Sequence, residues 1–482
     1  MVERLNKLVE SGLKNNQSVE EIRADLVNKG YLESDIIKTV KEISESLGIK
    51  RKTDNIISKL NKKMLLDRAS YGFSATQFIN ILFSMTGASL FFIGMINAIK
   101  SSVSTFLSAI LTDYSQKARI SDSFIRISGL CFGFSFIFLA LAVSIRSKWI
   151  FALSLLFGSI GIVSYGDSFK NIMIKKLGKT KFIVAVSKLT FIGLLITAIS
   201  ILLSGFLMDF IPVTGKMFYI QITESSKLAY KSFGYLIAFM ITAVMSILSA
   251  YILAKMNLGS TGDKVLFWDY ITFYFEQMKM KILRFTTNKY LFVLTIATLI
   301  IAVFQSVLNS FIGIHIYYTY QSEWFGGFVN VAIIYAIALL VSFAGPIIAA
   351  KLNKYLGLAP MFVFGSLIMA LLPLTIVYHP TAYYPAILVA TSLSVLGVAI
   401  IGSVQSLFAS KLLNDKDRQT YYATSGLVII PPFLVLVSIL LAIAQSTGIV
   451  SLFKYLGIGV LVFILPVYFL LVFWTSKKED FT

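Results

Sequence analysis

The chain has 482 residues, of which 57% are apolar and only 14% are charged. Its mean hydropathy is +0.79, whereas a typical soluble domain is ~45–50% apolar and ~25% charged. These values exclude an ordinary soluble enzyme and predict an all-α polytopic membrane protein. The formal net charge of +19 is explained below by membrane topology, so we expect no nucleic acid partner.

Residues 1–65 differ in composition from the rest and carry helix punctuation. Ser18 and Glu21 form a capping box, and Gly30 ends a helix. We therefore expect a soluble N-terminal cytoplasmic helical domain of three short helices. Around Gly30 and Tyr31 the segment resembles ubiquitin-associated (UBA-like) domains, which implies a protein partner; the alternative is a small appendage or docking module of unknown specificity.

Twelve apolar runs after residue 65 are long enough to cross a ~30 Å hydrocarbon core at 1.5 Å per residue. They cover approximately residues 70–88, 90–112, 124–144, 150–168, 183–207, 232–254, 290–313, 327–350, 359–378, 383–408, 421–444 and 451–474. Six runs lie on each side of a connection in which aromatic and basic residues interleave, as in a helix on the inner membrane surface. The expected units are a first half at 66–255, an amphipathic linker at 256–288, a second half at 289–475 and a tail at 476–482.

Basic residues predict the orientation of these runs, because Lys and Arg in short loops favour the cytoplasmic side. With both termini inside, the inside loops beyond residue 72 carry 21 Lys and Arg, whereas the outside loops carry only six. We therefore expect a multi-pass protein of the plasma membrane with cytoplasmic termini.

A related motif occurs after the second and the eighth runs. The first copy is Ala109-Ile-Leu-Thr-Asp113-Tyr114, followed by Lys117 and Arg119, and the second is Ala350-Lys-Leu-Asn-Lys354-Tyr355, followed by Gly357. Both resemble the loop motif of the major facilitator superfamily (MFS), Gly-x-Leu-x-Asp-Arg-x-Gly followed by basic residues. The first copy departs from it at Ala109, Tyr114 and Gln116, and the second has Lys354 in place of the acid.

This resemblance implies a secondary transporter built from two six-helix halves that rock about a central cavity. It also implies a gating role for the residues that match the motif or replace its acid, namely Asp113, Lys117, Arg119 and Lys354. The alternative is that Asp113 and Lys117 belong to a solvated loop.

In the MFS the first, fourth, seventh and tenth spans line the central cavity. Polar residues lie in each of these spans and in the second, and we expect them to bind substrate: Gln77, Asn80, Asn97, Lys100, Tyr165, Gln305, Asn309 and Gln405. The spacing of Gln77 and Asn80 by three residues, and of Gln305 and Asn309 by four, places each pair on one helix face. The alternative for the amides is that they hold neighbouring helices together.

Two charged residues lie well inside the predicted spans. Lys100 is near the middle of the second span, where it would bind an anion, pair with a carboxylate or move with gating. Asp167 is the only carboxylate well inside a span, and we expect it to couple transport to protons, with Lys170 and Lys188 nearby. A structural ion pair with either lysine is the alternative. The predicted first span, residues 70–88, contains no acid.

These patterns predict a secondary active transporter, a symporter or antiporter, that moves a small solute as a monomer in the lipid bilayer. We expect no enzyme activity, no metal and no cofactor, apart from coupling to protons or sodium. No nucleotide-binding loop occurs. The alternatives are a non-transporting sensor or scaffold and, with less support, a membrane-embedded lipid-modifying enzyme. The solute would be a polar or anionic metabolite, although the many aromatic residues also suit an amphipathic compound.

Overall fold

The computed structural model describes residues 2–14, 19–46, 49–117, 122–177, 179–210, 234–256, 288–320, 327–378 and 383–479, together with Phe325 and ten residues between 271 and 287. Within these ranges all regular secondary structure is helical, so the predicted all-α class is confirmed.

The N-terminal segment forms the three expected short helices, α1 (Val2–Lys14), α2 (Val19–Asn28) and α3 (Glu33–Ser46). They share a small core made of Leu5, Val9, Ile22, Leu26, Ile36 and Val40. Gly30 separates α2 from α3 with a φ of +84°, a conformation that glycine adopts without steric cost. The segment packs on itself and reaches the rest of the chain through α4.

Each half of the membrane region contains six crossings. In the first half these are α4 (Ile49–Phe73) with α5 (Thr76–Met85), α6 (Leu90–Lys117), α7 (Asp122–Ser144), α8 (Lys148–Leu177), α9 (Lys179–Phe210) and α10 (Gly234–Ala254). In the second half they are α12 (Lys289–Thr319), α13 (Gly327–Ser342) with α14 (Ala344–Leu356), α15 (Leu358–Tyr378), α16 (Tyr384–Leu412), α17 (Asp415–Thr447) and α18 (Ile449–Glu479).

The twelve predicted crossings are confirmed. Among the described residues, nine helical stretches are by themselves long and apolar enough to span a membrane. The shorter described apolar stretches of α8 and α18, together with the α4–α5 pair, make the remaining three crossings.

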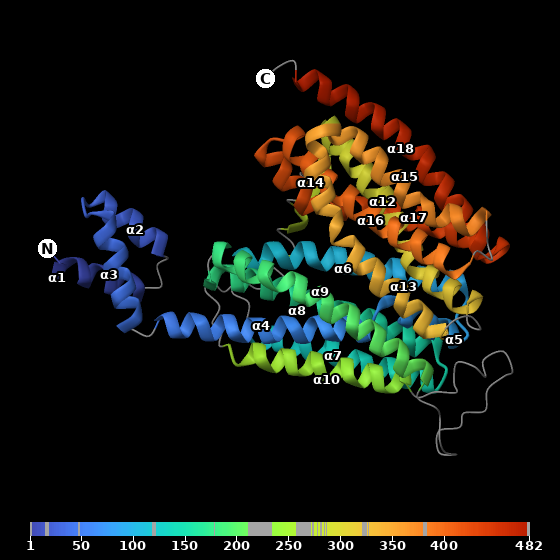
Figure 1. Ribbon diagram of the computed structural model, residues 1–482, viewed down its shortest axis with the longest axis horizontal. Coiled ribbons are helices and arrows are strands. Elements are labelled where there is room, and N and C mark those ends of the chain that lie inside the picture. Colours follow the sequence, from blue (N-terminus) through green and yellow to red (C-terminus); the bar gives the residue numbers. More distant parts are fainter. Residues whose placement is uncertain are drawn as a thin grey trace.

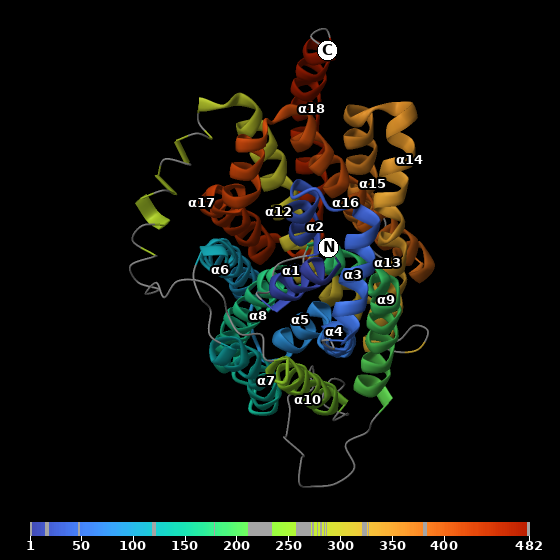
Figure 2. The same ribbon diagram turned by 90° about the vertical axis from the view of Figure 1, so that its left-hand side faces the viewer.

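The bundle has two ends, which we name for what lies there. At the termini face lie the N-terminal helices and the last turns of α18 (Figures 1 and 2). At the far face α5 ends, α6 begins and α13 begins. In Figure 1 the two halves converge toward the far face, on the right, and diverge toward α14 and the C-terminal end of α18.

The first crossing differs from the predicted run at 70–88. Helix α4 continues without a break from Ile49, and the chain bends at Ser74 and Ala75 before α5. As a result α4 carries Asp67 into the bundle, against Ser249 of α10. Lys63 and Ser249 donate hydrogen bonds to its two carboxylate oxygens, each at 2.5 Å.

The described part of the 256–288 connection contacts both halves of the bundle. Tyr274 is buried in a cluster with Ile110 of α6 and Leu427 of α17, while Lys279 is exposed. The aromatic residue at 274 therefore packs against protein rather than facing lipid, and the connection joins α6 to α17 near the termini face.

Replacing Asp67 with Ala should lower the thermal stability of the protein. Lys63 is only 3% exposed, and removing its carboxylate leaves a buried cation without that partner. We expect a loss of about 2 kcal/mol, below the ~3–5 kcal/mol of a fully buried pair, because Asp67 is 34% exposed. The measurement is thermal denaturation of the purified protein in detergent.

The matched control is Asp25→Ala, which breaks the exposed Lys29–Asp25 pair of α2. Exposed pairs contribute ~0–1 kcal/mol, so its effect should be small. Equal losses in the two variants would contradict a special role for the Asp67 pair.

Candidate functional site

Three of the helix pairs that join the two halves pack closely at a glycine. On α6, a Cβ added to Gly94 would lie 2.2 Å from the Leu441 side chain of α17. On α9, a Cβ at Gly205 would lie 2.6 Å from the Ala332 Cβ of α13. On α12, Gly313 packs directly on Gln77 of α5. The halves can approach this closely only because these positions lack side chains.

At the far face a carboxylate of one half binds a helix of the other. Asp209 Oδ2 on α9 accepts a hydrogen bond of 2.7 Å from the backbone N–H of Val329, in the first turn of α13. The unpaired N–H groups of a helix N-terminus favour a negative charge. This contact therefore fastens the far ends of the two halves together.

Other hydrogen bonds between the halves lie at similar depth. The Gln445 side chain accepts from the backbone N–H of Phe91 at 3.3 Å, and the hydroxyls of Ser84 and Tyr318 are 3.3 Å apart. The Ser438 hydroxyl also donates to the sulfur of Met95 at 3.3 Å. These contacts lie between the bundle centre and the far face, so this structure is closed at the far face.

Near the bundle centre, a chain of amides crosses from one half to the other. Asn97 of α6 donates to the Asn80 side chain of α5 at 2.9 Å, and Asn80 donates to the backbone carbonyl of Asn309 on α12 at 2.9 Å. Asn80 is fully buried, whereas the Asn309 side chain is exposed. The structure thus brings together four of the predicted residues: Gln77, Asn80, Asn97 and Asn309.

Gln405 lies elsewhere, in a polar cluster within the second half. Its amide donates to Thr298 of α12 at 3.3 Å, and the Thr298 hydroxyl is 2.8 Å from that of Tyr421 on α17. Thr298 precedes Asn309 by eleven residues, or roughly 16 Å along α12 at 1.5 Å per residue. Gln405 therefore does not join the amide chain, and Gln305 lies half-buried between the two groups.

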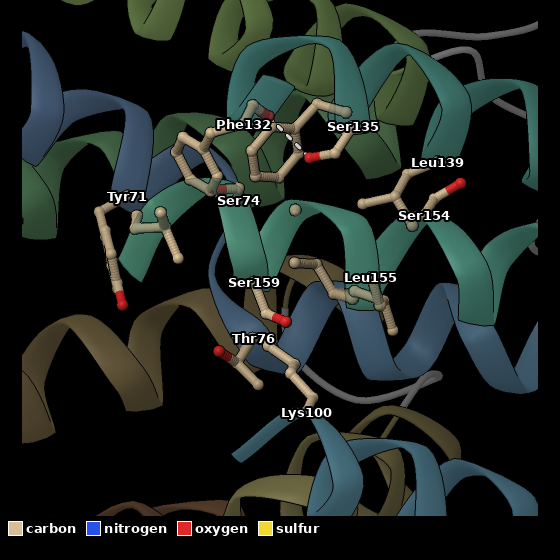
Figure 3. A pocket seen from close by; sticks show the side chains of 14 residues that line it. Tyr71, Ser74, Thr76, Lys100, Phe132, Ser135, Leu139, Ser154, Leu155 and Ser159 are labelled. Carbon is tan, nitrogen blue, oxygen red and sulfur yellow. Dashed lines mark hydrogen bonds between the residues drawn. The ribbon is translucent and has the colours of Figure 1, made fainter. Parts of the chain in front are cut away.

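Lys100 lines a cavity of about 80 Å³ inside the first half. Its side chain leaves α6 and lies beside Thr76 and Ser159 (Figure 3). The cavity is polar on several sides, and the hydroxyl-bearing residues of its wall are Tyr71, Ser74, Thr76, Ser135, Ser154 and Ser159.

The Lys100 ammonium makes no hydrogen bond or ion pair within the described part of the chain. A lysine at the centre of a bilayer costs ~2.5–3.5 kcal/mol on insertion scales. Lys100, in its hydroxyl-lined cavity, is therefore a candidate functional residue, because it forms no structural ion pair with a described residue.

The structure does not describe the side chains of several predicted residues. The side chains of Asp113, Lys117, Tyr165, Asp167, Lys170, Lys188 and Lys354 are not described, although their backbones are helical, and Arg119 lies outside the described residues. The predicted gating and coupling roles of these residues stay predictions.

Three residues of these contacts, Asp209, Thr298 and Tyr421, were not predicted from the sequence. Asp209 falls just beyond the predicted end of the fifth run at 207. A lone carboxylate at the end of an apolar run was the available signal. Thr298 and Tyr421 carry no such signal, since hydroxyls are common in membrane helices.

Solved structures with a similar fold are known, although the sequence itself finds no match. No family model and no curated protein matches the sequence. The nucleoside transporter NupG is similar over 87% of this chain and 98% of its own, at 12% identity and a TM-score of 0.61. A bacterial homologue of the human lysosomal transporter Spinster, inward-facing and unoccupied, is similar over 88% and 96%, at 13% identity and a TM-score of 0.59.

A POT family transporter in complex with a thioalcohol-conjugated peptide is also similar, over 87% of this chain and 96% of its own, at 14% identity and a TM-score of 0.59. The chain therefore has the MFS fold, with twelve membrane crossings in two halves, in a multi-pass membrane protein. All three of these neighbours are named as transporters. The resemblance of the N-terminal segment to UBA-like domains finds no support.

Replacing Gly205 with Leu should separate the halves at the far face, since the added side chain meets Ala332 and the Phe328 carbonyl. Spin labels on cysteines at Ile145 and Tyr383, which are 53% and 69% exposed on opposite halves, would report the distance in a Cys131→Ser background. We expect Gly205→Leu to add a population with a longer distance.

Gly402→Leu is the matched control, because a Cβ at Gly402 meets no atom within 4 Å. It should leave the distance between the two labels unchanged. An unchanged distribution in Gly205→Leu as well would mean that this glycine does not hold the far face closed.

Proposed function

We propose that the protein is a secondary active transporter that moves a small solute by alternating access. The observation that carries this proposal is the uneven contact between the halves. They meet at Asp209–Val329 and at the glycine pairs, whereas toward the termini face they diverge except where α6 and α17 pack around Tyr274. Such a joint lets the halves rock about the centre rather than separate. The similarity to transporters of nucleosides and peptides supports the proposal.

The orientation that we propose places the termini face in the cytoplasm. Exposed basic residues such as Lys255, Lys351 and Lys411 lie at that end, and the positive-inside rule favours their retention there. In this orientation we propose that the structure, which is closed at the far face, represents an inward-facing state, as the Spinster homologue is described. We further propose the plasma membrane as its location.

Exchange between the two states requires the far-face contacts to break and termini-face contacts to form. The Asp209–Val329 hydrogen bond and the glycine contacts are few and local. Because they can break without disturbing the packing inside either half, the halves can move as rigid bodies. We propose that Asp113, Lys117, Arg119 and Lys354 make the corresponding contacts at the termini face. We also propose that Asp167, with Lys170 and Lys188, couples transport to protons or sodium.

Rigid-body rocking predicts that opening one face closes the other. Spin labels at Lys62 of α4 and Tyr355 of α14, both exposed near the termini face, should therefore move closer together in Gly205→Leu, in which the far face opens. Gly402→Leu should leave this distance as in the parent protein. A termini-face distance that stays constant while the far face opens would rule out rocking as the mechanism.

Orientation is tested by cysteine labelling of intact cells, again without Cys131. A membrane-impermeant maleimide should label Tyr383→Cys, at the far face, from outside the cell. Tyr355→Cys should react only after the membrane is permeabilised. The reverse pattern would place the termini outside and make the present state outward-open.

A further inference from the structure

We propose that the Lys100 cavity binds an oxyanion group, a carboxylate or a phosphate, of the transported solute. The inference rests on the proposed transport function, and it specifies the chemical class of the substrate and where its charge is bound. It is carried by the depth of the cavity, its charge, its size and its connection to the other half.

Two lining residues on different helices, Lys100 and Ser159, lie at a similar depth in the membrane. Lys100 follows the start of α6 at Leu90 by ten residues, and Ser159 follows the start of α8 at Lys148 by eleven. At 1.5 Å per residue, each lies roughly 15 Å from the start of its helix, which is at the far face. That depth is the middle of a ~30 Å hydrocarbon core, where substrate sites of such transporters are expected.

The cavity wall contains one lysine and, among its lining residues, no carboxylate. A cation without a counter-ion at this depth attracts an anion more strongly than it would in water, because the surroundings screen charge poorly. An ammonium has three N–H donors and no acceptor. A carboxylate or a phosphate supplies both the negative charge and the acceptor oxygens.

The hydroxyls of the wall can adapt to such a group. In this structure the Ser135 hydroxyl donates to the Phe132 carbonyl at 2.6 Å, and the Ser159 hydroxyl donates to the Leu156 carbonyl at 2.7 Å. Rotation of either hydroxyl would turn its donor into the cavity, because the proton of a hydroxyl rotates to suit its partner.

The cavity is large enough for a small charged group. It offers about 80 Å³ to the centre of a water-sized sphere, whereas one water molecule needs roughly 10–15 Å³ on this measure. It therefore accommodates an oxyanion group, and Tyr71 in its wall is 61% exposed.

Occupation of the cavity would be felt by the other half. Lys100 follows Asn97 by three residues and so lies on the same face of α6. From Asn97, two hydrogen bonds lead through Asn80 to the backbone of α12. An anion at Lys100 is therefore next to the one polar connection that we describe between the halves at mid-membrane depth.

The test is ligand-induced thermal stabilisation of the purified full chain. The probes are acetate, inorganic phosphate, glucose and choline, at constant ionic strength. At least one of the two anions should raise the melting temperature saturably, whereas glucose and choline should not. Lys100→Met should weaken anion binding at least about tenfold, as expected for loss of a charge-assisted hydrogen bond. Lys100→Arg should retain binding, and Ser159→Ala should weaken it a few-fold.

Lys62→Met is the matched control, since it removes an exposed lysine of α4 and should leave the anion response intact. An equal response in Lys100→Met and the parent protein, no response of the parent to either anion, or a response to choline or glucose alone would each overturn the proposal. If Lys100→Met does not fold, the proposal is still tested by anion binding to Ser159→Ala and Lys100→Arg and by the selectivity of the parent protein. If the far-face distance lengthens and the termini-face distance shortens in Gly205→Leu but no anion binds, the proposed transport mechanism stands and only the proposed substrate class is rejected.

Discussion

The hydrocarbon core of a bilayer offers no hydrogen-bond partner to a backbone or a side chain, and the structure follows from this constraint. Every crossing is helical because a helix satisfies its own N–H and C=O groups. Many polar side chains inside the bundle are paired for the same reason, as Asp67 is with Lys63 and Ser249. The Lys100 ammonium instead faces a cavity and has no partner in the described part of the chain.

The contact between the halves has two components with different physical properties. Glycine positions such as Gly94 and Gly205 allow close packing of backbone and small groups, which is strong only at full contact and is lost over a short movement. The Asp209–Val329 hydrogen bond and the Asn97–Asn80–Asn309 chain are directional and few. An interface made in this way holds one arrangement firmly and gives way to another without a graded series of intermediates.

Helical spacing was enough to predict which amides share a helix face. Gln77 and Asn80 share a face of α5, and that face meets Asn309 and Gly313 of α12. It was not enough to predict that Gln405 pairs with Thr298, at a different depth, because spacing along one helix says nothing about the vertical offset between two helices. Asp209 was missed for a related reason: its partner is a backbone N–H of a distant helix, which leaves no pattern in the sequence.

By itself the sequence determined the all-α class, the number of crossings and the three N-terminal helices, since these depend on local hydrophobicity, length and caps. Only the tertiary structure decided that α4 packs Asp67 against α10, that the halves are closed at the far face, and that Lys100 shares a cavity with the hydroxyls of Ser135 and Ser159. These features depend on how helices far apart in the chain pack against one another, and packing is a property of the assembled bundle rather than of any one segment.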